Sequence, residues 1–309
     1  MFSVIFPGQG SQFIGMAKDF YDNFKYVRDY FSIADEILKK KLTKVIFEGP
    51  KDTLDLTENT QPAIFLVSYS IFNVIKNETK FKINDAKFFA GHSLGEYSAL
   101  CCSKSINFEQ TIELLKHRGK AMQDAVPKGE GGMIAILGSE IDEIHNLLKN
   151  NENNFKCFVA NDNTKGQIVV SGKINQLNIF EEELNKLKIK YLRLPVSAPF
   201  HCPLMSNATN FMTGKIQDTK FNDPVPRIIS NVTAKPQYKN EDIKKLLIEQ
   251  IEKTVRWRES INYMINSGVQ KFIEVGPGKV LSGLVKRIDR KVKLNQINNM
   301  EDLNILEND

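Results

Sequence analysis

A glycine–serine–glycine pattern at residues 91–95, G-H-S-L-G, constrains this chain more than any other stretch. An apolar run at residues 86–90 precedes it and predicts a buried strand, and residues 96–103 are rich in helix formers. A serine in a sharp strand-to-helix turn is a nucleophile elbow, in which the glycines avoid Cβ clashes and the hydroxyl projects above the sheet. The turn also predicts that the Leu94 N–H and the positive end of the helix lie beside Ser93, where an acyl oxyanion would form.

Composition narrows the class of protein around this turn. A chain of 309 residues with 41% hydrophobic content is long enough to bury a sizeable core. The first residues lack the charged and apolar regions of a secretory signal, and no apolar run approaches the roughly 18 residues of a membrane span. We therefore expect a cytoplasmic protein that does not enter a membrane. A net charge of +5 is mild and does not indicate nucleic-acid binding, and the four cysteines show no spacing typical of zinc or disulfides.

The order of predicted elements divides the chain into two domains. Residues 127–196 read strand, helix, strand, strand, helix and strand, which is typical of a small ferredoxin-like α+β domain. Residues 1–126 and 197–309 alternate apolar strands with helices, which predicts a large α/β-hydrolase-like domain with a parallel sheet core. The expected fold class is therefore α/β with an inserted domain, and a ligand cleft is expected between the two. The tail after Arg290 is polar and is expected to be peripheral.

A serine nucleophile needs a general base, and histidine is the commonest one. The chain has four histidines. His92 adjoins the nucleophile in a tight turn, so its imidazole should point away from the serine hydroxyl. His145 is expected on the surface of the small domain, and His117 can face the cleft only if its neighbour Arg118 does not. His201 lies in a proline-flanked loop at the domain boundary, and we therefore favour it as the base.

Two further residues, Gln9 and Arg118, are candidates for the site, and each also has a purely structural interpretation. The segment P-G-Q-G-S-Q at residues 7–12 follows a short predicted strand, and its glycines leave the N–H of Gln9 accessible, as an oxyanion donor requires. An isolated G-x-G is more often a plain turn. Arg118 lies on a helix predicted over residues 108–122, where an arginine is more often solvated than functional.

These motifs together resemble those of a known family. They are similar to the motifs of the malonyl-CoA:acyl carrier protein transacylases of fatty-acid synthesis, in the same order over nearly the whole chain and with an inserted domain in the same place. The motifs are G-Q-G-S-Q at 8–12, G-H-S-L-G-E at 91–96, H-R-G at 117–119, F-H at 200–201 and G-P-G at 276–278.

The resemblance implies a set of catalytic residues. Ser93 is the acylated nucleophile, and His201 is its base. Gln250 orients His201, as a neutral residue in place of the buried aspartate of serine proteases, which a reactive thioester substrate tolerates. The N–H groups of Gln9 and Leu94 form the oxyanion hole.

Three residues are expected to bind substrate. The resemblance implies that Arg118 holds the malonyl carboxylate through two charge-assisted hydrogen bonds. Asn161 matches a family asparagine near the cleft. Phe200 directly precedes the base and is a candidate wall of the acyl pocket against a methyl branch, with ordinary loop packing as the alternative.

The implied reaction is a ping-pong transfer of malonyl from coenzyme A to Ser93 and then to the phosphopantetheine thiol of an acidic acyl carrier protein, which binds transiently. No cofactor and no metal is expected, and we expect a monomer. The alternative is a serine esterase or thioesterase, which fits less well because the chain has no HGGG-like oxyanion loop and its histidine follows the inserted domain. A third hypothesis is a non-catalytic module that only docks the carrier.

Overall fold

The computed structural model describes residues 1–127, 129–196 and 198–307. Positions 128 and 197, which belong to the expected boundary loops of the inserted domain, lie outside the described residues, as do 308 and 309. Within the described ranges, no helix is both long enough and apolar enough to cross a membrane.

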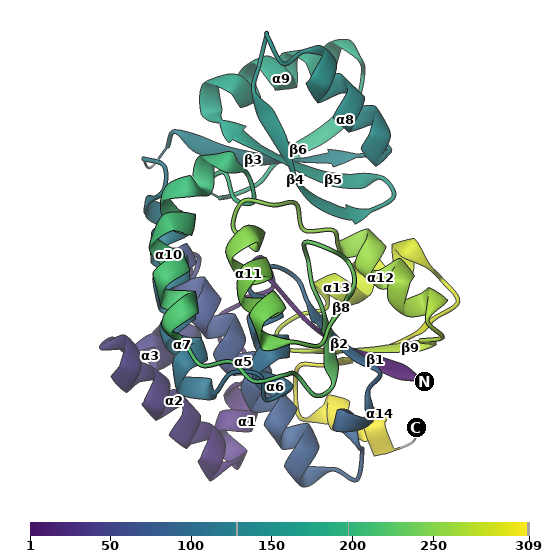
Figure 1. Cartoon of the computed structure of the whole chain (residues 1–309). Coiled ribbons are helices and arrows are strands. Elements are labelled where there is room, and N and C mark those ends of the chain that lie inside the picture. The colour runs from purple at the N-terminus through teal and green to yellow at the C-terminus, as the bar shows by residue number, and fades with distance from the viewer. Residues whose placement is uncertain (128, 197, 308–309) are drawn as a thin grey trace.

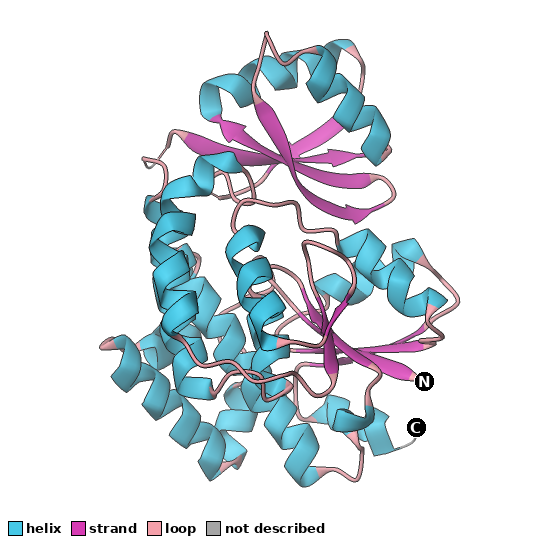
Figure 2. Ribbon diagram, in the orientation of Figure 1, coloured by secondary structure: helices cyan, strands magenta, loops and turns pink. Residues whose placement is uncertain are grey.

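The larger part of the chain is built on a sheet that, among the described residues, has six strands in the order β10-β9-β1-β2-β7-β8. Pairing is parallel from β10 through to β7, and β8 runs antiparallel to β7. Parallel strands need crossover connections, and helices supply them on both faces of the sheet (Figure 2). The strands are β1 (Phe2–Phe6), β2 (Phe88–Gly91), β7 (Arg227–Ile229), β8 (Pro236–Gln237), β9 (Lys271–Val275) and β10 (Lys293–Ile297).

The two faces of this sheet bury different helices, because successive strand residues point to opposite sides. Val4 and Phe6 of β1 belong to a cluster with the helices of the N-terminal half, whereas Ile5 packs with α12 and α13. The helices of this part are α1 (Lys18–Asn23), α2 (Lys25–Leu38), α3 (Leu42–Glu48), α4 (Lys51–Leu54), α5 (Thr57–Glu78), α6 (Gly95–Cys102), α7 (Phe108–Asp124), α10 (Ser206–Asp218), α11 (Asn240–Gln250), α12 (Trp257–Asn266), α13 (Val280–Ile288) and α14 (Asn304–Glu307).

The segment between α7 and α10 forms a separate antiparallel sheet with the strand order β4-β5-β3-β6. Helices α8 and α9 lie on the side of this sheet that faces away from the rest of the molecule, at the top of Figure 1. Its own cluster of buried apolar residues fills the space beneath these helices. The elements are β3 (Gly131–Leu137), α8 (Ile141–Asn150), β4 (Cys157–Thr164), β5 (Gln167–Lys173), α9 (Ile174–Lys186) and β6 (Lys190–Arg193).

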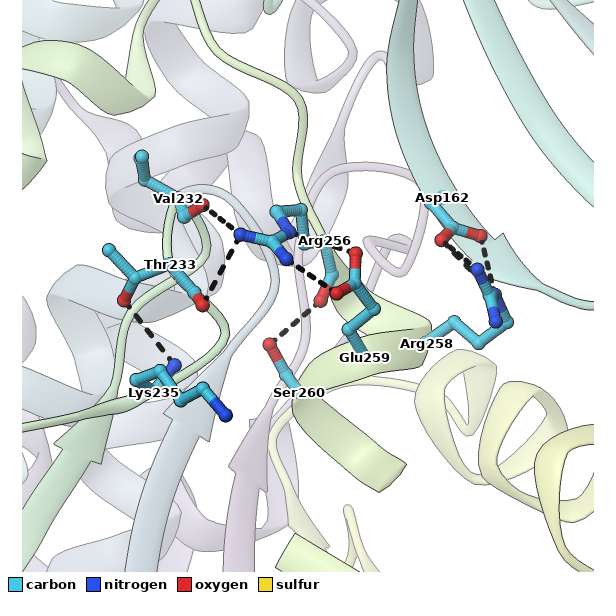
Figure 3. A network of polar contacts seen from close by, with 8 residues as sticks. All are labelled: Asp162, Val232, Thr233, Lys235, Arg256, Arg258, Glu259 and Ser260. Carbon is cyan, nitrogen blue, oxygen red and sulfur yellow. Dashed lines mark hydrogen bonds and ion pairs between the residues drawn. The ribbon is translucent and has the colours of Figure 1, made fainter. Parts of the chain in front are cut away.

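Strand β4 ties the small unit to the large one. The Asp162 N–H donates to the Val255 carbonyl at 3.0 Å, and the Val255 N–H donates to the Ala160 carbonyl at 2.8 Å. Figure 3 shows the ion pairs at this junction, where the Arg258 guanidinium donates three hydrogen bonds to the Asp162 carboxylate at 2.8 to 3.1 Å. Main-chain and charged contacts therefore both fix the position of β4 against the large unit.

The tail after Arg290 differs from the prediction. Residues Lys293–Ile297 form β10, which pairs in parallel with β9 and completes one edge of the large sheet. The expectation of a peripheral tail was wrong because an edge strand is only partly covered, so its side chains here are mostly polar. Ile297, at its end, is fully buried.

Candidate active site

The strand, turn and helix predicted around Ser93 are present. β2 ends at Gly91, α6 begins at Gly95, and Ser93 lies between them with a φ of 53°. A Cβ on Gly91 would lie 1.9 Å from the Gly95 carbonyl oxygen, and a Cβ on Gly95 would lie 2.3 Å from that of Phe6. Real Cβ atoms essentially never approach closer than 3.0 Å, so only glycine fits either position. Sterics thus fix the turn that presents the Ser93 hydroxyl.

His201 lies beside the serine hydroxyl, as the sequence predicts. Its Nε2 is 2.8 Å from Ser93 Oγ, and its Nδ1 is 2.8 Å from the main-chain oxygen of Gln250. Because a carbonyl oxygen only accepts, Nδ1 carries the proton and Nε2 is free to take one from the serine. Burial and the nearby Arg118 cation lower the pKa of His201 to about 3. The imidazole is therefore a neutral base at physiological pH.

Gln250 orients His201 with its main chain rather than its side chain. The side-chain amide accepts a hydrogen bond from Arg118 Nη2 at 2.8 Å and donates to Glu96 Oε2 at 2.7 Å and to the Ser93 carbonyl at 3.0 Å. The expectation that this side chain takes the place of an aspartate was therefore wrong about the atom. Any residue type supplies a main-chain oxygen, so the sequence carries no signal for that contact.

Arg118 on α7 is buried, with 1% of its surface exposed, although an arginine on a helix is usually solvated. Its Nη1 donates to Gln61 Oε1 at 2.8 Å, and its Nη2 donates to Gln250 Oε1 at 2.8 Å and to Ser93 Oγ at 3.2 Å. These partners are uncharged, and its Nε has no hydrogen-bond partner among the described residues. Burial lowers the pKa of Arg118, but a guanidinium stays charged in proteins. The site therefore holds a buried cation whose hydrogen bonds go to neutral groups.

A cavity of about 300 Å³ opens in front of the serine. Most of the residues that the sequence singles out line it together, and Gln250 lies behind Arg118 instead. A volume of this size suits a small acyl group with part of its carrier arm. The predicted residues that line the cavity are Gln9, Ser93, Leu94, Arg118, Asn161, Phe200 and His201.

The two candidate oxyanion donors belong to segments of the cavity wall that pack against each other. A Cβ on Gly8 would lie 2.6 Å from the His92 carbonyl oxygen, so the loop that carries Gln9 packs directly against the elbow. Leu94 is the residue before the first helical position of α6, where main-chain N–H groups have no partner within the helix. In the described part of the chain, no hydrogen bond engages the main-chain N–H of either Gln9 or Leu94. Both donors are thus available to a ligand oxygen.

Asn161 and Phe200 form another part of the cavity wall. The Asn161 Oδ1 atom is buried and has no hydrogen-bond partner among the described residues. Phe200 is 7% exposed, and its carbonyl accepts a hydrogen bond from Ser171 at 2.6 Å. One residue thus offers an unused acceptor, and the other offers a fixed apolar surface.

The remaining histidines lie away from the nucleophile. His92 Nε2 is 2.8 Å from Asn163 Oδ1, which holds its ring away from the serine hydroxyl, as predicted. His117 packs against Phe211 outside the cavity, which leaves Arg118 as the neighbour that faces inward. His145 on α8 is exposed.

Sequence reasoning missed the site roles of Glu96, Asn231 and Gln61. Glu96 is 1% exposed in a short helix whose residues are all buried, and an acidic residue in such a segment is a signal in itself. Asn231 follows β7 at the carboxyl edge of the parallel sheet, where ligand sites of open α/β sheets occur. Gln61 had no local signal, because it lies within the long buried helix α5.

The described residues contain no group of three or more histidine, cysteine, aspartate or glutamate side chains that could hold a metal ion. The four cysteines are buried free thiols. The groups that meet at the Ser93 hydroxyl are the neutral imidazole of His201 and the Arg118 cation.

Comparisons with known proteins agree with this geometry. Residues 3–305 match the acyl transferase domain family. The malonyl CoA-acyl carrier protein transacylase of Bacillus subtilis is 40% identical over 305 residues, which cover 97% of this chain and 94% of that protein.

Solved structures give the same result. The acyl-carrier-protein-S-malonyltransferase of Bartonella henselae superposes with a TM-score of 0.95 at 39% identity, over 98% of this chain and 97% of that one. A malonyl-transacylase solved in complex with its type II PKS acyl-carrier protein superposes with a TM-score of 0.95 at 35% identity, over 100% of this chain and 99% of that one. Because family match, sequence identity and fold agree over almost the whole length, this chain belongs to the acyl transferase domain family and, within it, to the malonyl-CoA:acyl carrier protein transacylases.

Proposed function

We propose that this protein transfers malonyl from malonyl-CoA to the phosphopantetheine thiol of an acyl carrier protein through a malonyl group bound to Ser93. The observation that carries the proposal is the position of Arg118. Its guanidinium is buried, is bonded only to uncharged groups and lies 3.2 Å from Ser93 Oγ. A cation placed there suits an acyl group that ends in a carboxylate.

In the first half-reaction, His201 Nε2 takes the proton of Ser93 as the serine oxygen attacks the thioester carbonyl carbon. The resulting oxyanion accepts hydrogen bonds from the main-chain N–H groups of Gln9 and Leu94. When the carbon–sulfur bond breaks, the coenzyme A sulfur leaves and receives the proton from His201. The products are malonyl-serine, free coenzyme A thiol and a neutral imidazole.

The second half-reaction uses the same groups in reverse. The carrier's thiol gives its proton to His201, and its sulfur attacks the carbonyl carbon of malonyl-Ser93. The serine oxygen then leaves and takes the proton back. The main-chain carbonyl of Gln250 accepts from Nδ1 in both steps, so it keeps the ring in one orientation and leaves Nε2 as the atom that gains and loses the proton.

Arg118 accounts for the choice of malonyl. A malonyl carboxylate placed on its guanidinium gains charge-assisted hydrogen bonds worth about 1.5 to 3 kcal/mol each. An acetyl group would leave the buried cation without a counter-ion, so we expect malonyl to be preferred by at least 10- to 100-fold.

Two further residues are proposed to contact substrate. The buried Asn161 Oδ1 suits an amide N–H of the pantetheine arm, which coenzyme A and the carrier share. Phe200 is proposed to limit branching at the malonyl α-carbon, and faster transfer of methylmalonyl by Phe200→Ser would support this role. Methylmalonyl rates equal to those of the wild type would instead support plain packing.

The architecture is proposed to be an α/β-hydrolase-like domain of residues 1–126 and 197–309 with a ferredoxin-like insertion at 127–196. The strand order β4-β5-β3-β6 and the alternation of strands and helices support this assignment. The similar malonyl-transacylase solved with its acyl-carrier protein supports a transient carrier partner for this chain. The monomeric state and the cytoplasmic location stay predictions. An esterase is less well supported. In the described residues, His201 is oriented by the main-chain carbonyl of Gln250 rather than by the acidic side chain of a hydrolase triad.

The test is to trap the intermediate. Purified protein mixed with malonyl-CoA should gain one malonyl mass by intact-protein mass spectrometry, and holo acyl carrier protein should remove it. Ser93→Ala should show no adduct, and Arg118→Ala should form the malonyl adduct more slowly while relatively favouring acetyl. An adduct lost to water at the same rate with and without the carrier would contradict the transfer and favour a hydrolase.

A further inference from the structure

Glu96 is a buried acid whose role the reaction above does not explain. It lies in the first turn of α6, three residues after the nucleophile, with 1% of its surface exposed. In the described ranges, no ion pair involves it. Burying an acidic group without a direct ion pair is costly, so its hydrogen bonds must account for its presence.

One oxygen of Glu96 accepts two hydrogen bonds from different parts of the chain. Glu96 Oε2 accepts a hydrogen bond from the side-chain Nε2 of Gln250 at 2.7 Å and another from the main-chain N–H of Asn231 at 3.1 Å. Gln250 ends α11 and Asn231 follows β7, so one carboxyl group joins the elbow helix to both. Each of these two residues in turn contacts a reactive part of the site.

The hydrogen bond from Gln250 to Glu96 determines which end of the Gln250 side-chain amide faces Arg118. Because Nε2 donates to Glu96 and to the Ser93 carbonyl, Oε1 is left to accept from Arg118 Nη2 at 2.8 Å. A flipped amide would set its NH₂ against the guanidinium, and both groups only donate. Glu96 therefore selects the orientation in which Gln250 holds Arg118.

The side chain of Asn231 bridges the two ends of the elbow at Ser93. The Asn231 Oδ1 accepts from the Ser93 N–H at 2.7 Å, and its Nδ2 donates to the Gly91 carbonyl at 2.7 Å. Ser93 has a φ of 53°, a conformation that non-glycine residues adopt at some cost. The side chain of Asn231 thus clamps both ends of the strained turn, and Glu96 holds the main chain of Asn231.

The arrangement also keeps the Glu96 carboxyl group from bonding directly to Arg118, where the substrate carboxylate would bind. A carboxylate bonded directly to Arg118 would compete with the carboxylate of the substrate. With Gln250 in between, Glu96 lies one side chain away and the guanidinium is held by a neutral oxygen.

We propose that Glu96 is a positioning residue that fixes the Gln250 amide and the Asn231 clamp, and thereby aligns Arg118 with the malonyl carboxylate and Ser93 with the thioester. The inference rests on the proposed function, because it assumes that Arg118 binds the acyl carboxylate. Glu96 itself contacts neither the substrate nor the reacting atoms.

The test compares three substitutions at this position by rates of Ser93 acylation with malonyl-CoA and acetyl-CoA. Glu96→Gln keeps a carbonyl oxygen where Oε2 lies and should keep the malonyl preference within about threefold. Glu96→Met fills similar volume without an acceptor and should lower that preference at least tenfold, mainly by raising KM for malonyl-CoA. Its acylation rates with both substrates should also fall, because the clamp on the elbow is loosened.

Glu96→Asp covers the case in which Glu96→Met does not fold. It keeps the acid but draws the oxygens back by one methylene, and it should lower the malonyl preference at least threefold. A folded Glu96→Met, or failing that a Glu96→Asp, with wild-type preference would overturn the inference. If the wild type itself forms no malonyl-Ser93, the proposed function fails instead, so the two failures are distinct.

Discussion

Arg118 in the cavity and Arg258 at the junction between the two sheets differ in the charge of the groups that their guanidinium groups contact. Arg258 makes three hydrogen bonds to the Asp162 carboxylate, whose side chain is 4% exposed (Figure 3). Arg118 is more deeply buried, yet its bonds go to two amide oxygens and a hydroxyl. Arg258, which joins two parts of the fold, is paired with an acid, whereas Arg118, which we propose to bind an anionic ligand, is held by neutral groups.

The largest effect is expected when an acidic side chain is placed directly beside Arg118, as Asp162 is beside Arg258. Gln61→Glu replaces the neutral oxygen 2.8 Å from Arg118 Nη1 with a carboxylate of the same shape. We expect kcat/KM for malonyl-CoA to fall about 100-fold, or about 3 kcal/mol, because the new ion pair competes with the substrate carboxylate. The control is Gln61→Met, which removes the acceptor without adding charge and should cost less than about tenfold. A Gln61→Glu enzyme with wild-type kcat/KM would refute the contrast.

The next effect concerns Glu96, the acid kept one side chain from Arg118. Burial raises the pKa of Glu96 from 4.5 to about 7, so the folded state retains the proton to higher pH than the unfolded state. Its favourable contribution to stability is complete below pH 4.5 and is lost as pH rises through about 7. From about pH 5 to 8, the free energy of unfolding of the wild type should fall by about 2 kcal/mol relative to Glu96→Gln, measured by urea denaturation. Parallel pH profiles for the two proteins would contradict this.

A smaller effect is expected at the junction. Arg258→Gln leaves the Asp162 carboxylate without its cation. Because the Arg258 side chain is 27% exposed and solvent screens the pair, we expect a loss of about 1 kcal/mol in the free energy of unfolding, with the malonyl preference unchanged. The matched control is Arg256→Gln in the neighbouring pair, whose side chains with Glu259 are 40% and 41% exposed. That pair is screened by solvent and should contribute less. Equal losses for the two variants, or a changed substrate preference in Arg258→Gln, would show that the junction pair acts differently.

The smallest expected change is in a pH profile that should be nearly flat. Burial and the unpaired Arg118 lower the pKa of His201 to about 3, so the base is lost only as pH falls toward that value. Single-turnover acylation at saturating malonyl-CoA should therefore change less than about twofold between pH 8 and 5. A base with the ordinary histidine pKa would lose most of its activity over that range, and such a profile would contradict the assignment.

Some elements could be predicted because their constraints are local. The elbow at Ser93 follows from glycines that no other residue could replace, and the helix predicted over residues 108–122 is visible within a short window of sequence. The edge strand β10 could not be found this way, because it is stabilised by pairing with β9 rather than by apolar side chains of its own.

The candidate site divides in the same manner. Residue identity and motif order point to the nucleophile, the base and the cation, since these depend on side-chain chemistry that the sequence states directly. Which atom of Gln250 orients His201 was decided by the fold, because the contact uses a main-chain oxygen.

The sequence by itself determined the reactive groups and the turn that presents the serine, because both depend on a few neighbouring residues. Only the tertiary structure decided that Arg118 would be buried among neutral oxygens and that Glu96 would meet Asn231 and Gln250. These residues lie far apart along the chain and come together where parallel strands end at one edge of a sheet. Hydrogen bonds at such a distance leave no periodic or compositional trace, so packing rather than pattern fixed them.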